Sequence, residues 1–214
     1  MKSWALLSDT HGVLPNPELF AEASVVLHAG DIGPDHDVEQ WQKKVFCPWL
    51  EQLQGLGVSF YGTYGNHDHP SKWKAYSHQP IKDQRIVVDR AVEIDDELVW
   101  FSPWSVTFGS WAWMSSEGKL AEKFDKIPDR TTMIVSHTPM YRELGGMTLR
   151  GDEAGSVAMR YLVDQISEAD LHTFVCGHIH EGYGRYNLDG VDIINASQMD
   201  LNYQSVNGLM WKAR

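Results

Sequence analysis

The chain of 214 residues has the length of one ordinary domain and is long enough to bury a hydrophobic core without disulfide or metal cross-links. Its 29 acidic and 18 basic residues give a formal net charge of −11, which weighs against a surface that binds nucleic acid or an anionic membrane. Two cysteines, Cys47 and Cys176, indicate neither a disulfide framework nor a thiolate metal cluster, and no apolar run matches a signal peptide or a membrane span. We therefore expect one cytoplasmic domain over residues 1–214.

Strand-like and helical segments alternate in the first half of the chain. Three apolar runs have the length and composition of buried strands. They are residues 4–8, 25–29 and 58–64. Between them, residues 17–24 and 41–55 have helical character, the second segment with a break near Pro48. This order favours a parallel sheet, so we expect an α/β fold.

The second half of the chain has further strand-like runs, at residues 132–136 and 171–176. Two hairpins with antiparallel strands are also expected, one around an acidic turn and one around Asp189-Gly190. Their strands are residues 85–94 with 98–101, and residues 182–187 with 191–195. Residues 145–155, rich in glycine and polar side chains, predict the most mobile loop of the chain.

Polar residues follow five of the predicted strands, each at the point where the strand ends. They are Asp9 and His11, Asp31, Asn66 and His67, His137, and the pair His178 and His180. Because the carboxyl ends of parallel strands meet at one edge of a sheet, we expect these side chains to converge. Any one of these strand ends alone is also compatible with an ordinary polar turn, whereas five together favour a metal site.

The residue types in this set indicate which metals would bind. Carboxylate, imidazole and amide oxygen suit Mn²⁺, iron or Zn²⁺ better than Ca²⁺, which prefers oxygen ligands only. Eight polar residues are enough for two metal ions, and a carboxylate shared between two cations would offset their repulsion. Asp31 is the candidate for this bridge. His178 and His180 lie two residues apart in an extended segment, so their side chains share one face.

These motifs, in their order along the chain, resemble the five signatures of the calcineurin-like metallophosphoesterases. The matching residues are Asp9-x-His11, Gly30-Asp31, Gly65-Asn66-His67-Asp68, His137 and Gly177-His178-x-His180. The stretches HTP at 137–139, GHIHEGYG at 177–184 and INAS at 194–197 further resemble a small fetal-brain-type subgroup. The resemblance implies a four-layer α/β/β/α sandwich of two mixed sheets flanked by helices. It also implies two divalent metal ions, most often Mn²⁺, with Fe, Zn²⁺, Ni²⁺ or Mg²⁺ as alternatives.

The resemblance also implies which residues bind each metal. The first ion would be held by Asp9, His11, Asp31 and His180. The second would be held by Asp31, Asn66, His137 and His178. His67 would face the substrate and protonate the leaving group or stabilise the transition state, or else have only a packing role. Asp68 would either orient His67 or cap a turn.

The expected reaction is hydrolysis of a small phosphodiester, such as a cyclic nucleotide. Two metals would lower the pKa of a bridging water, so that a bridging hydroxide attacks in line and the metals bind the phosphate oxygens. A phosphomonoesterase or nucleotidase is the alternative, and a nuclease or a non-catalytic scaffold is less favoured. The expected partner is a small phosphoester rather than a membrane or nucleic acid; the oligomeric state stays open.

Two further groups of residues have alternative interpretations. Four tryptophans close together either form an aromatic wall that stacks on a base or pack in the core. They are Trp100, Trp104, Trp111 and Trp113. Three arginines near the predicted loop, Arg142, Arg150 and Arg160, either contact phosphate or are solvated. Acidic residues after Gly33, beginning with Asp35, are interpreted as the start of a helix.

Overall fold

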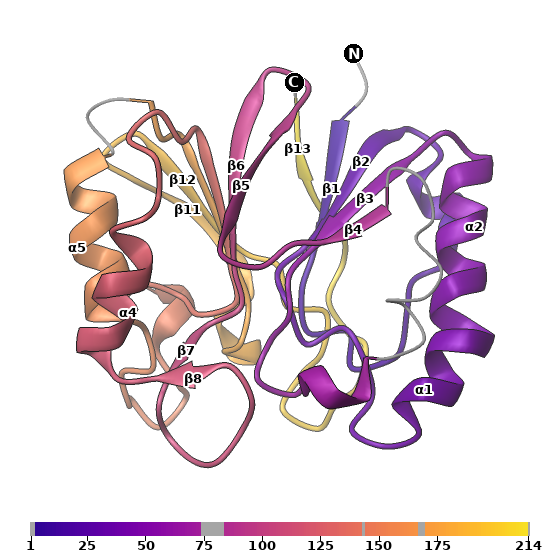
Figure 1. Cartoon of the computed structure of the whole chain (residues 1–214), viewed down its shortest axis with the longest axis horizontal. Helices are drawn as coiled ribbons and strands as arrows, with labels where there is room; N and C mark the ends of the chain where they lie inside the picture. The colour runs from indigo at the N-terminus through magenta and orange to yellow at the C-terminus, as the bar shows by residue number, and fades with distance from the viewer. Residues whose placement is uncertain (1–2, 74–83, 143, 167–169, 214) are drawn as a thin grey trace.

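The computed structural model describes residues 3–73, 84–142, 144–166 and 170–213. Two β-sheets face each other in the middle of the molecule, and helices cover the outer face of each sheet (Figure 1). This arrangement confirms the expected four-layer α/β/β/α sandwich. Within the described ranges, no helix has the length and apolar character needed to cross a membrane.

The first sheet has the strand order β13-β1-β2-β3-β4. Its strands are β1 (Ser3–Leu7), β2 (Ala23–His28), β3 (Ser59–Gly62), β4 (Gln84–Ile86) and β13 (Met210–Lys212). Strands β1 to β4 run parallel, and β13 pairs antiparallel with β1 at the edge. The parallel sheet predicted for the first half of the chain is therefore present.

The second sheet has the order β11-β12-β10-β9-β6-β5. Its strands are β5 (Arg90–Ile94), β6 (Glu97–Ser102), β9 (Met133–Ser136), β10 (Thr173–Cys176), β11 (Gly184–Leu188) and β12 (Val191–Asn195). The two predicted hairpins form its antiparallel edges, while the inner strands are parallel. A separate small pair consists of β7 (Ser105–Val106) and β8 (Met114–Ser115).

Helices occupy the two outer layers. Beside the first sheet lie α1 (Val38–Trp41), a π-helical turn (Gln42–Phe46) and α2 (Cys47–Gly55), and beside the second lie α4 (Glu117–Phe124) and α5 (Val157–Ile166). Short 3₁₀ turns lie at Pro17–Phe20, Pro70–Lys72, Leu144–Gly146 and His180–Gly182. The carboxylate of Glu117 on α4 accepts hydrogen bonds from the first backbone amides of α5, which joins the two helices.

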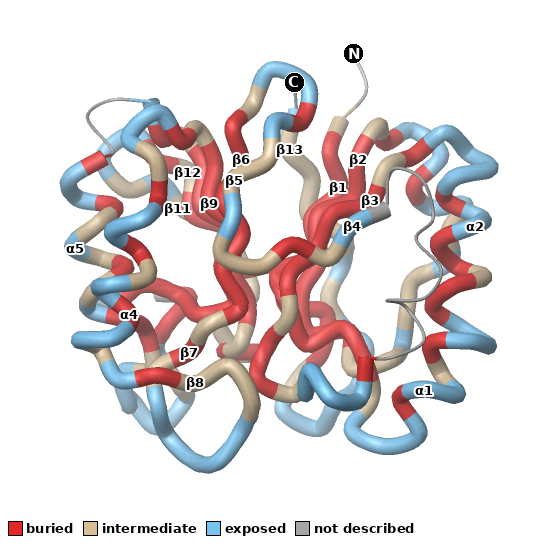
Figure 2. The backbone as a smooth tube through the Cα atoms, viewed as in Figure 1, coloured by how far each residue is buried: buried red, intermediate tan, exposed pale blue. Residues whose placement is uncertain are grey.

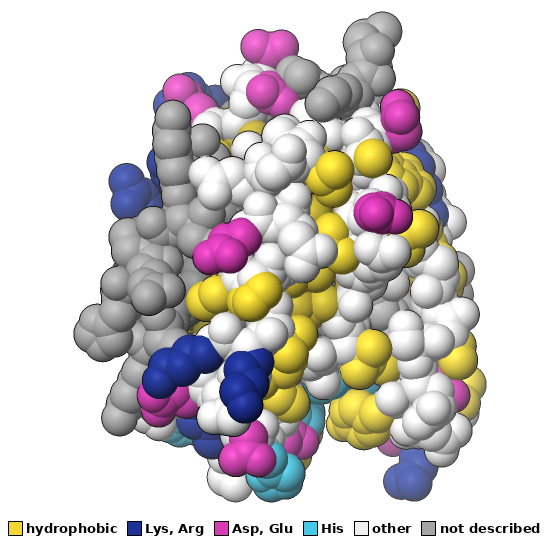
Figure 3. All heavy atoms as spheres, turned by 90° about the vertical axis from the view of Figure 1, so that its right-hand side faces the viewer, with side chains coloured by type: hydrophobic (Ala, Val, Ile, Leu, Met, Phe, Trp, Pro, Cys, Tyr) yellow, Lys and Arg dark blue, Asp and Glu magenta, His cyan; other side chains and the backbone are white. Residues whose placement is uncertain are grey.

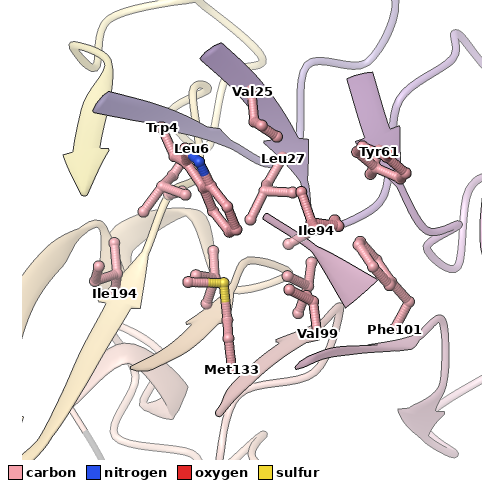
Figure 4. Close-up of a cluster of buried hydrophobic side chains, with 14 of the residues drawn as sticks. Trp4, Leu6, Val25, Leu27, Tyr61, Ile94, Val99, Phe101, Met133 and Ile194 are labelled. Atoms are coloured by element: carbon pink, nitrogen blue, oxygen red, sulfur yellow. The ribbon is translucent and has the colours of Figure 1, made fainter. Parts of the chain in front are cut away.

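Alternate side chains of the strands fill different layers of the core. On β1, Trp4 and Leu6 face the second sheet, whereas Ala5 and Leu7 face the helical layer beside the first sheet. All four are fully buried, which explains why this strand is a continuous apolar run instead of an alternating one. Figure 4 shows the side chains between the sheets pointing toward one another, and Figure 2 shows burial concentrated in the strands while the outer helix faces are exposed.

The helix predicted at residues 17–24 is wrong beyond its first turn. A 3₁₀ turn ends at Phe20, and β2 begins at Ala23, because the β-branched run that follows pairs with β1 and β3. The helix predicted at 41–55 is present but begins at Val38. It does not break near Pro48. Instead, the preceding turn widens so that the N–H of Cys47 bonds the Gln42 carbonyl, since proline has no N–H to donate in the next position.

The single strand predicted at residues 85–94 is also wrong. It is two strands, β4 and β5, which belong to different sheets, and β4 pairs parallel with β3. The chain changes sheets at Asp89, which has a positive φ of 46°. Helices α4 and α5 and strands β7, β8 and β13 were not predicted from the sequence.

Candidate metal centre

The predicted ligands converge at one edge of the molecule, where strands of both sheets end. Asp9 and His11 follow β1, Asp31 follows β2 and Asn66 lies beyond β3. His137 follows β9, and His178 and His180 lie just beyond β10. Figure 3 shows histidine side chains at the lower edge of its face, next to hydrophobic side chains. Ligand atoms of Asp9, Asp31 and His137 lie within 4.8 Å of one another, as do those of Asp9, His11 and His180.

Asp31 lies between the two halves of this cluster. Its Oδ2 is 3.4 Å from Nε2 of His137 and 3.9 Å from Nε2 of His11. Its Oδ1 accepts a hydrogen bond of 2.8 Å from the backbone N–H of His67, which fixes the carboxylate orientation. The position between two histidines from different sheets is what a carboxylate shared by two metal ions requires.

Asp9 is held on the other side of the cluster. Its Oδ1 is 3.6 Å from Nε2 of His180, and its Oδ2 accepts a hydrogen bond of 2.7 Å from the Ser197 hydroxyl. The backbone N–H of His178 also donates to this carboxylate. Nε2 of His180 in turn lies 3.2 Å from Nε2 of His11. The carboxylate is therefore oriented by groups outside the cluster, and its Oδ1 faces the histidines.

Two histidines direct their Nε2 atom at a carboxylate. Nδ1 of His137 lies 3.0 Å from the Ala29 carbonyl and Nδ1 of His180 lies 2.9 Å from the Asp200 carbonyl; since carbonyls only accept, both Nδ1 atoms carry the hydrogen. In the neutral rings, Nε2 then presents a lone pair toward Asp31 or Asp9, which are acceptors as well. Only a proton or a cation placed between them makes such contacts favourable. The donor set therefore fits bound metal ions.

Burial and the close approach of histidines to carboxylates together set the pKa values in the cluster. Burial alone would raise the pKa of Asp31 and of Asp9, but the nearby histidines outweigh burial and lower both. Burial alone would lower the pKa of His137 and of His180, but Asp31 and Asp9 respectively raise each to about 9. For His178, burial dominates and lowers the pKa to about 3, so its ring is neutral.

His178 approaches the cluster from the side of β10. Its ring centroid lies 4.9 Å from that of His137, and it shares a cavity wall with Asp31 and Asn66. Asn66 Oδ1 is 2.9 Å from Nε2 of His137. The structure thus brings all seven predicted metal ligands into one region, with His178 held by its backbone N–H on the Asp9 carboxylate and by the contact of its ring with His137.

The backbone at these strand ends adopts conformations that are unusual for residues other than glycine. Asp9, His11, Asp31 and His178 have positive φ angles of 51°, 42°, 53° and 68°. Each costs on the order of 1–3 kcal/mol. Each large side chain buried in the core contributes about 1.5–3 kcal/mol, and many are fully buried, so the core stabilises these turns. Strain of this kind is typical of functional sites.

Two glycines allow the cluster to pack this closely. A Cβ on Gly177 would lie 2.1 Å from Oδ2 of Asp9, and one on Gly65 would lie 2.2 Å from Oδ1 of Asp31. Gly182, predicted to relieve crowding in the same loop, would place a Cβ 2.6 Å from the Gly145 carbonyl oxygen. A larger residue at any of these positions would displace the ligand loops.

His28 joins the turn that carries Asp9 to the turn that carries Asp31. The Gly30 N–H donates to Nδ1 of His28, so Nε2 carries the hydrogen and donates to the Thr10 hydroxyl, which donates to the Ile32 carbonyl. Burial lowers the pKa of His28 to about 3, which keeps the ring in this neutral form. The turns that carry Asp9 and Asp31 are therefore fixed relative to each other.

His67 lies at the opening of the cluster and is oriented by a residue not predicted for this role. Its Nδ1 is 2.7 Å from Oδ1 of Asp35, a half-exposed carboxylate at the loop before α1. Asp68 does not make this contact. Its carboxylate accepts hydrogen bonds from the backbone N–H groups of Ile32, Gly33 and Gly65, so of the two alternatives for Asp68 the structure shows the turn cap.

A cavity of about 530 Å³ opens onto the cluster. Its lining includes Asp31, Asn66, His67, His178 and His180. Three aromatic residues at its wall are largely exposed, and each contacts a different histidine of the cluster. Trp111 packs on His67, Phe108 on His178, and Tyr203 on His11 and His180. Exposed aromatic rings around a cavity are typical of a binding site.

Of the four tryptophans considered, only Trp111 lines this cavity. Trp100 is buried in the core, Trp104 donates to the carboxylate of Asp89, and Trp113 stacks on Tyr64. The packing interpretation therefore holds for three of them. None of the three arginines near the predicted loop is among the described lining residues. The loop itself is tied by backbone hydrogen bonds, including Ala154 to Gly146 and Thr148 to Asp152.

Several residues that support the site were missed at the level of sequence. Asp35, Ser197 and Asp200 hold His67, Asp9 and His180, respectively. Asn195 donates through one amide to the carbonyls of Gly145 and Ile179, which joins the loop to the turn with His180. Ser197 and Asn195 belong to the INAS stretch, the one sequence signal for them.

Comparison with known proteins agrees with this geometry. A family model described as calcineurin-like phosphoesterase matches residues 4–182. The human metallophosphoesterase domain-containing protein 1 is 32% identical over 120 residues, which cover 56% of this chain and 36% of that protein. A UPF0046 protein from Caenorhabditis elegans is 25% identical over 210 residues, covering 92% of this chain and 70% of that protein. The chain thus spans about a third of the length of the human relative.

A solved structure has the same fold. The crystal structure of a dimetal phosphatase from Danio rerio superposes with a TM-score of 0.51 at 13% identity, covering 91% of this chain and 86% of that chain. At this identity the likeness shows the fold alone. Taken with the family match over most of the chain, the chain belongs to the calcineurin-like phosphoesterases, a family of metal-dependent phosphoester hydrolases.

Proposed function

We propose that this protein is a dinuclear metal-dependent phosphodiesterase that acts on small diesters such as cyclic nucleotides. The observation that carries the proposal is the pair of histidines, His137 and His180, whose Nε2 atoms point at the carboxylates of Asp31 and Asp9 while each Nδ1 faces a backbone carbonyl. Such contacts are favourable when a cation lies between the ligands. Two of them, joined through Asp31, support two metal ions.

The ligands divide into two groups that share Asp31. In our proposal one metal is held by Asp9, His11, Asp31 and His180, and the other by Asp31, Asn66, His137 and His178. The close approach of Asp9, His11 and His180, and the 2.9 Å between Asn66 Oδ1 and His137 Nε2, support this division. Two divalent ions, for which we favour Mn²⁺, would activate a water molecule for attack on phosphorus and neutralise charge on the phosphate oxygens. Imidazole, carboxylate and amide ligands without a thiolate are compatible with this choice.

The residues of the chain position the substrate and move protons. Nδ1 of His67 faces the carboxylate of Asp35, so Nε2 is the ring nitrogen that, in the doubly protonated ring, would give its proton to the leaving oxygen. The backbone N–H of His67 holds Asp31, and Asp68 fixes the turns on either side. His67 and Asp31 are therefore our proposed catalytic residues, and Asp68, placed among them from the sequence, becomes a residue that positions their turns.

The cavity supports a diester over a monoester. Its wall carries the exposed rings of Phe108, Trp111 and Tyr203, which would contact an organic group on phosphorus. None of its described lining residues is a lysine or arginine, the groups that commonly bind the second negative charge of a monoester. The phosphomonoesterase alternative lacks such an observation in its favour.

The proposal is tested by hydrolysis of bis(p-nitrophenyl) phosphate and of p-nitrophenyl phosphate in the presence of Mn²⁺. We expect kcat/KM for the diester to exceed that for the monoester by at least about tenfold, which corresponds to about 1.4 kcal/mol. Activity should disappear with a chelator and return with added metal. A preference for the monoester would reject the phosphodiesterase proposal in favour of the phosphatase.

Replacing Trp111 with alanine should weaken binding of a nucleotide diester more than of a non-aromatic one. Stacking of a base on an aromatic side chain contributes about 1–3 kcal/mol, so KM for a cyclic nucleotide should rise at least about fivefold. Trp111→Phe, which keeps a ring, should restore most of this loss. Trp104→Phe removes the hydrogen bond to Asp89 and should lower the thermal midpoint while leaving KM unchanged. Equal KM values in wild type and Trp111→Ala would exclude stacking on this ring.

A further inference from the structure

The wall of the cavity contains three carboxylates that the proposed mechanism does not use. Asp152 and Glu153 come from the loop between β9 and α5, and Glu181 follows His180. We call these three residues the acidic wall. They line the same cavity as Asp31, Asn66 and His178, and the described lining contains no lysine or arginine to neutralise them.

The acidic wall is held in place by the fold. The carboxylate of Glu181 accepts a hydrogen bond of 2.8 Å from the backbone N–H of Leu149, and that of Glu153 accepts one of 2.9 Å from the backbone N–H of Arg142. The backbone N–H of Asp152 donates to the Thr148 hydroxyl, and the backbone N–H of Thr148 donates to the Asp152 carbonyl. The fold thereby orients the carboxylates of Glu153 and Glu181, and all three acidic residues line the cavity.

The charges at the site determine how strongly these carboxylates would repel a substrate. Two divalent ions against the carboxylates of Asp9 and Asp31 leave an excess of two positive charges at the centre, which attracts any phosphate. The acidic wall repels each negative charge on the incoming molecule, and it does so in a partly enclosed cavity where screening is weaker than in bulk water. A second or third charge on the substrate therefore meets added repulsion without a basic side chain to offset it.

We propose that Asp152, Glu153 and Glu181 act as a charge filter that admits phosphodiesters with a single negative charge and disfavours dianionic monoesters and polyphosphates. The inference rests on the proposed function in one respect, that the substrate occupies this cavity. It goes beyond that function by naming the feature that sets the preference. None of Arg142, Arg150 and Arg160 is among the described lining residues.

The test measures binding apart from turnover. Phenylphosphonate, at a pH where it is a dianion, and methyl(phenyl)phosphinate, a monoanion, attach their organic groups to phosphorus through carbon only, so neither contains an ester bond to hydrolyse. Their affinities for the Mn²⁺-loaded protein are measured by calorimetry. The variant is Asp152→Asn/Glu153→Gln/Glu181→Gln, whose amides keep an acceptor oxygen for the two backbone hydrogen bonds. Glu22→Gln/Glu51→Gln/Glu122→Gln removes the same charge from exposed positions outside the cavity and is the matched control.

We expect the triple variant to bind the dianion at least about tenfold more tightly and the monoanion less than about threefold more tightly, with the difference shrinking at high salt. The control should change neither affinity, and the metal content of both variants should match wild type. An equal change for the two ligands, or no binding of either, would overturn the charge filter. If wild type hydrolyses neither nitrophenyl ester but shows the charge-dependent binding, the proposed function fails while the filter stands.

Discussion

Replacing Asp31 with asparagine is expected to lower metal-dependent phosphodiester hydrolysis by more than about a hundredfold, since even residues that only support a metal ligand commonly cost 10–100-fold. The carboxylate lies between His11 and His137 and is our proposed ligand shared by the two metals. Asparagine keeps the size of the side chain and one acceptor oxygen, so the hydrogen bond from the His67 backbone can persist. What is lost is the negative charge that offsets the repulsion of two cations.

The loss should be visible in metal content as well as in rate. Purified wild-type protein should bind two equivalents of Mn²⁺, and Asp31→Asn one or none, measured by atomic emission after dialysis against the metal. The matched control is Asp37→Asn, which removes the same charge at an exposed position with a similar positive φ of 52°. Retained activity in Asp31→Asn with a full metal content would show that this carboxylate is not the bridge.

The sequence predicted the site better than it predicted the elements around it. Strands that end abruptly at aspartate, histidine or glycine are local features, and the parallel order of β1, β2 and β3 brings their ends together without further information. For this reason the proposed ligand residues from Asp9 to His180 were predicted as one set, and the structure brings them together. The geometry adds the hydrogen bonds that orient them, which come from Ser197 and from the Asp200 carbonyl, distant in the chain.

Other features depend on contacts that no local pattern contains. From the sequence, Asp35 was interpreted as the start of a helix. Only the folded chain places it beside His67. The chain passes from one sheet to the other at Asp89 in the middle of an apolar run, so periodicity alone merges β4 and β5. Likewise, the aromatic residues near 100–113 look alike in sequence, and whether each packs or lines the cavity is decided by the turn between β7 and β8.

The affinity for Mn²⁺ should rise steeply with pH in the neutral range. In the metal-free protein, Asp31 and Asp9 raise the pKa of His137 and His180 to about 9. Both rings therefore carry a proton on each nitrogen at neutral pH. A metal binds only the neutral imidazole, and binding must therefore release these protons. Between about pH 6 and pH 8, each metal that displaces one proton should bind about a hundredfold more tightly, tenfold per pH unit.

The stability of the metal-free protein should fall as the pH rises, whereas the affinity for Mn²⁺ rises. A folded-state pKa above the unfolded value of 6.5 means that His137 and His180 contribute stability that is fully present below about pH 6.5 and is lost as the pH rises through about 9. The thermal midpoint of the metal-free protein should fall over this window, whereas that of the metal-bound protein should not, because the metal then replaces the protons. His172→Gln, which removes a partly exposed histidine away from the cluster, is the control and should leave both trends unchanged.

Calorimetric titration with Mn²⁺ in two buffers of different ionisation enthalpy counts the released protons directly. We expect about two protons per protein near neutral pH, one from each raised histidine, and about one in His180→Gln. An affinity independent of pH, with no proton release, would mean that these nitrogens are not the metal ligands. Because the same Nε2 contacts carry the proposed function, that result would remove its main support. Proton release at both histidines would instead connect the acid–base chemistry of the cluster to the binding of its metals.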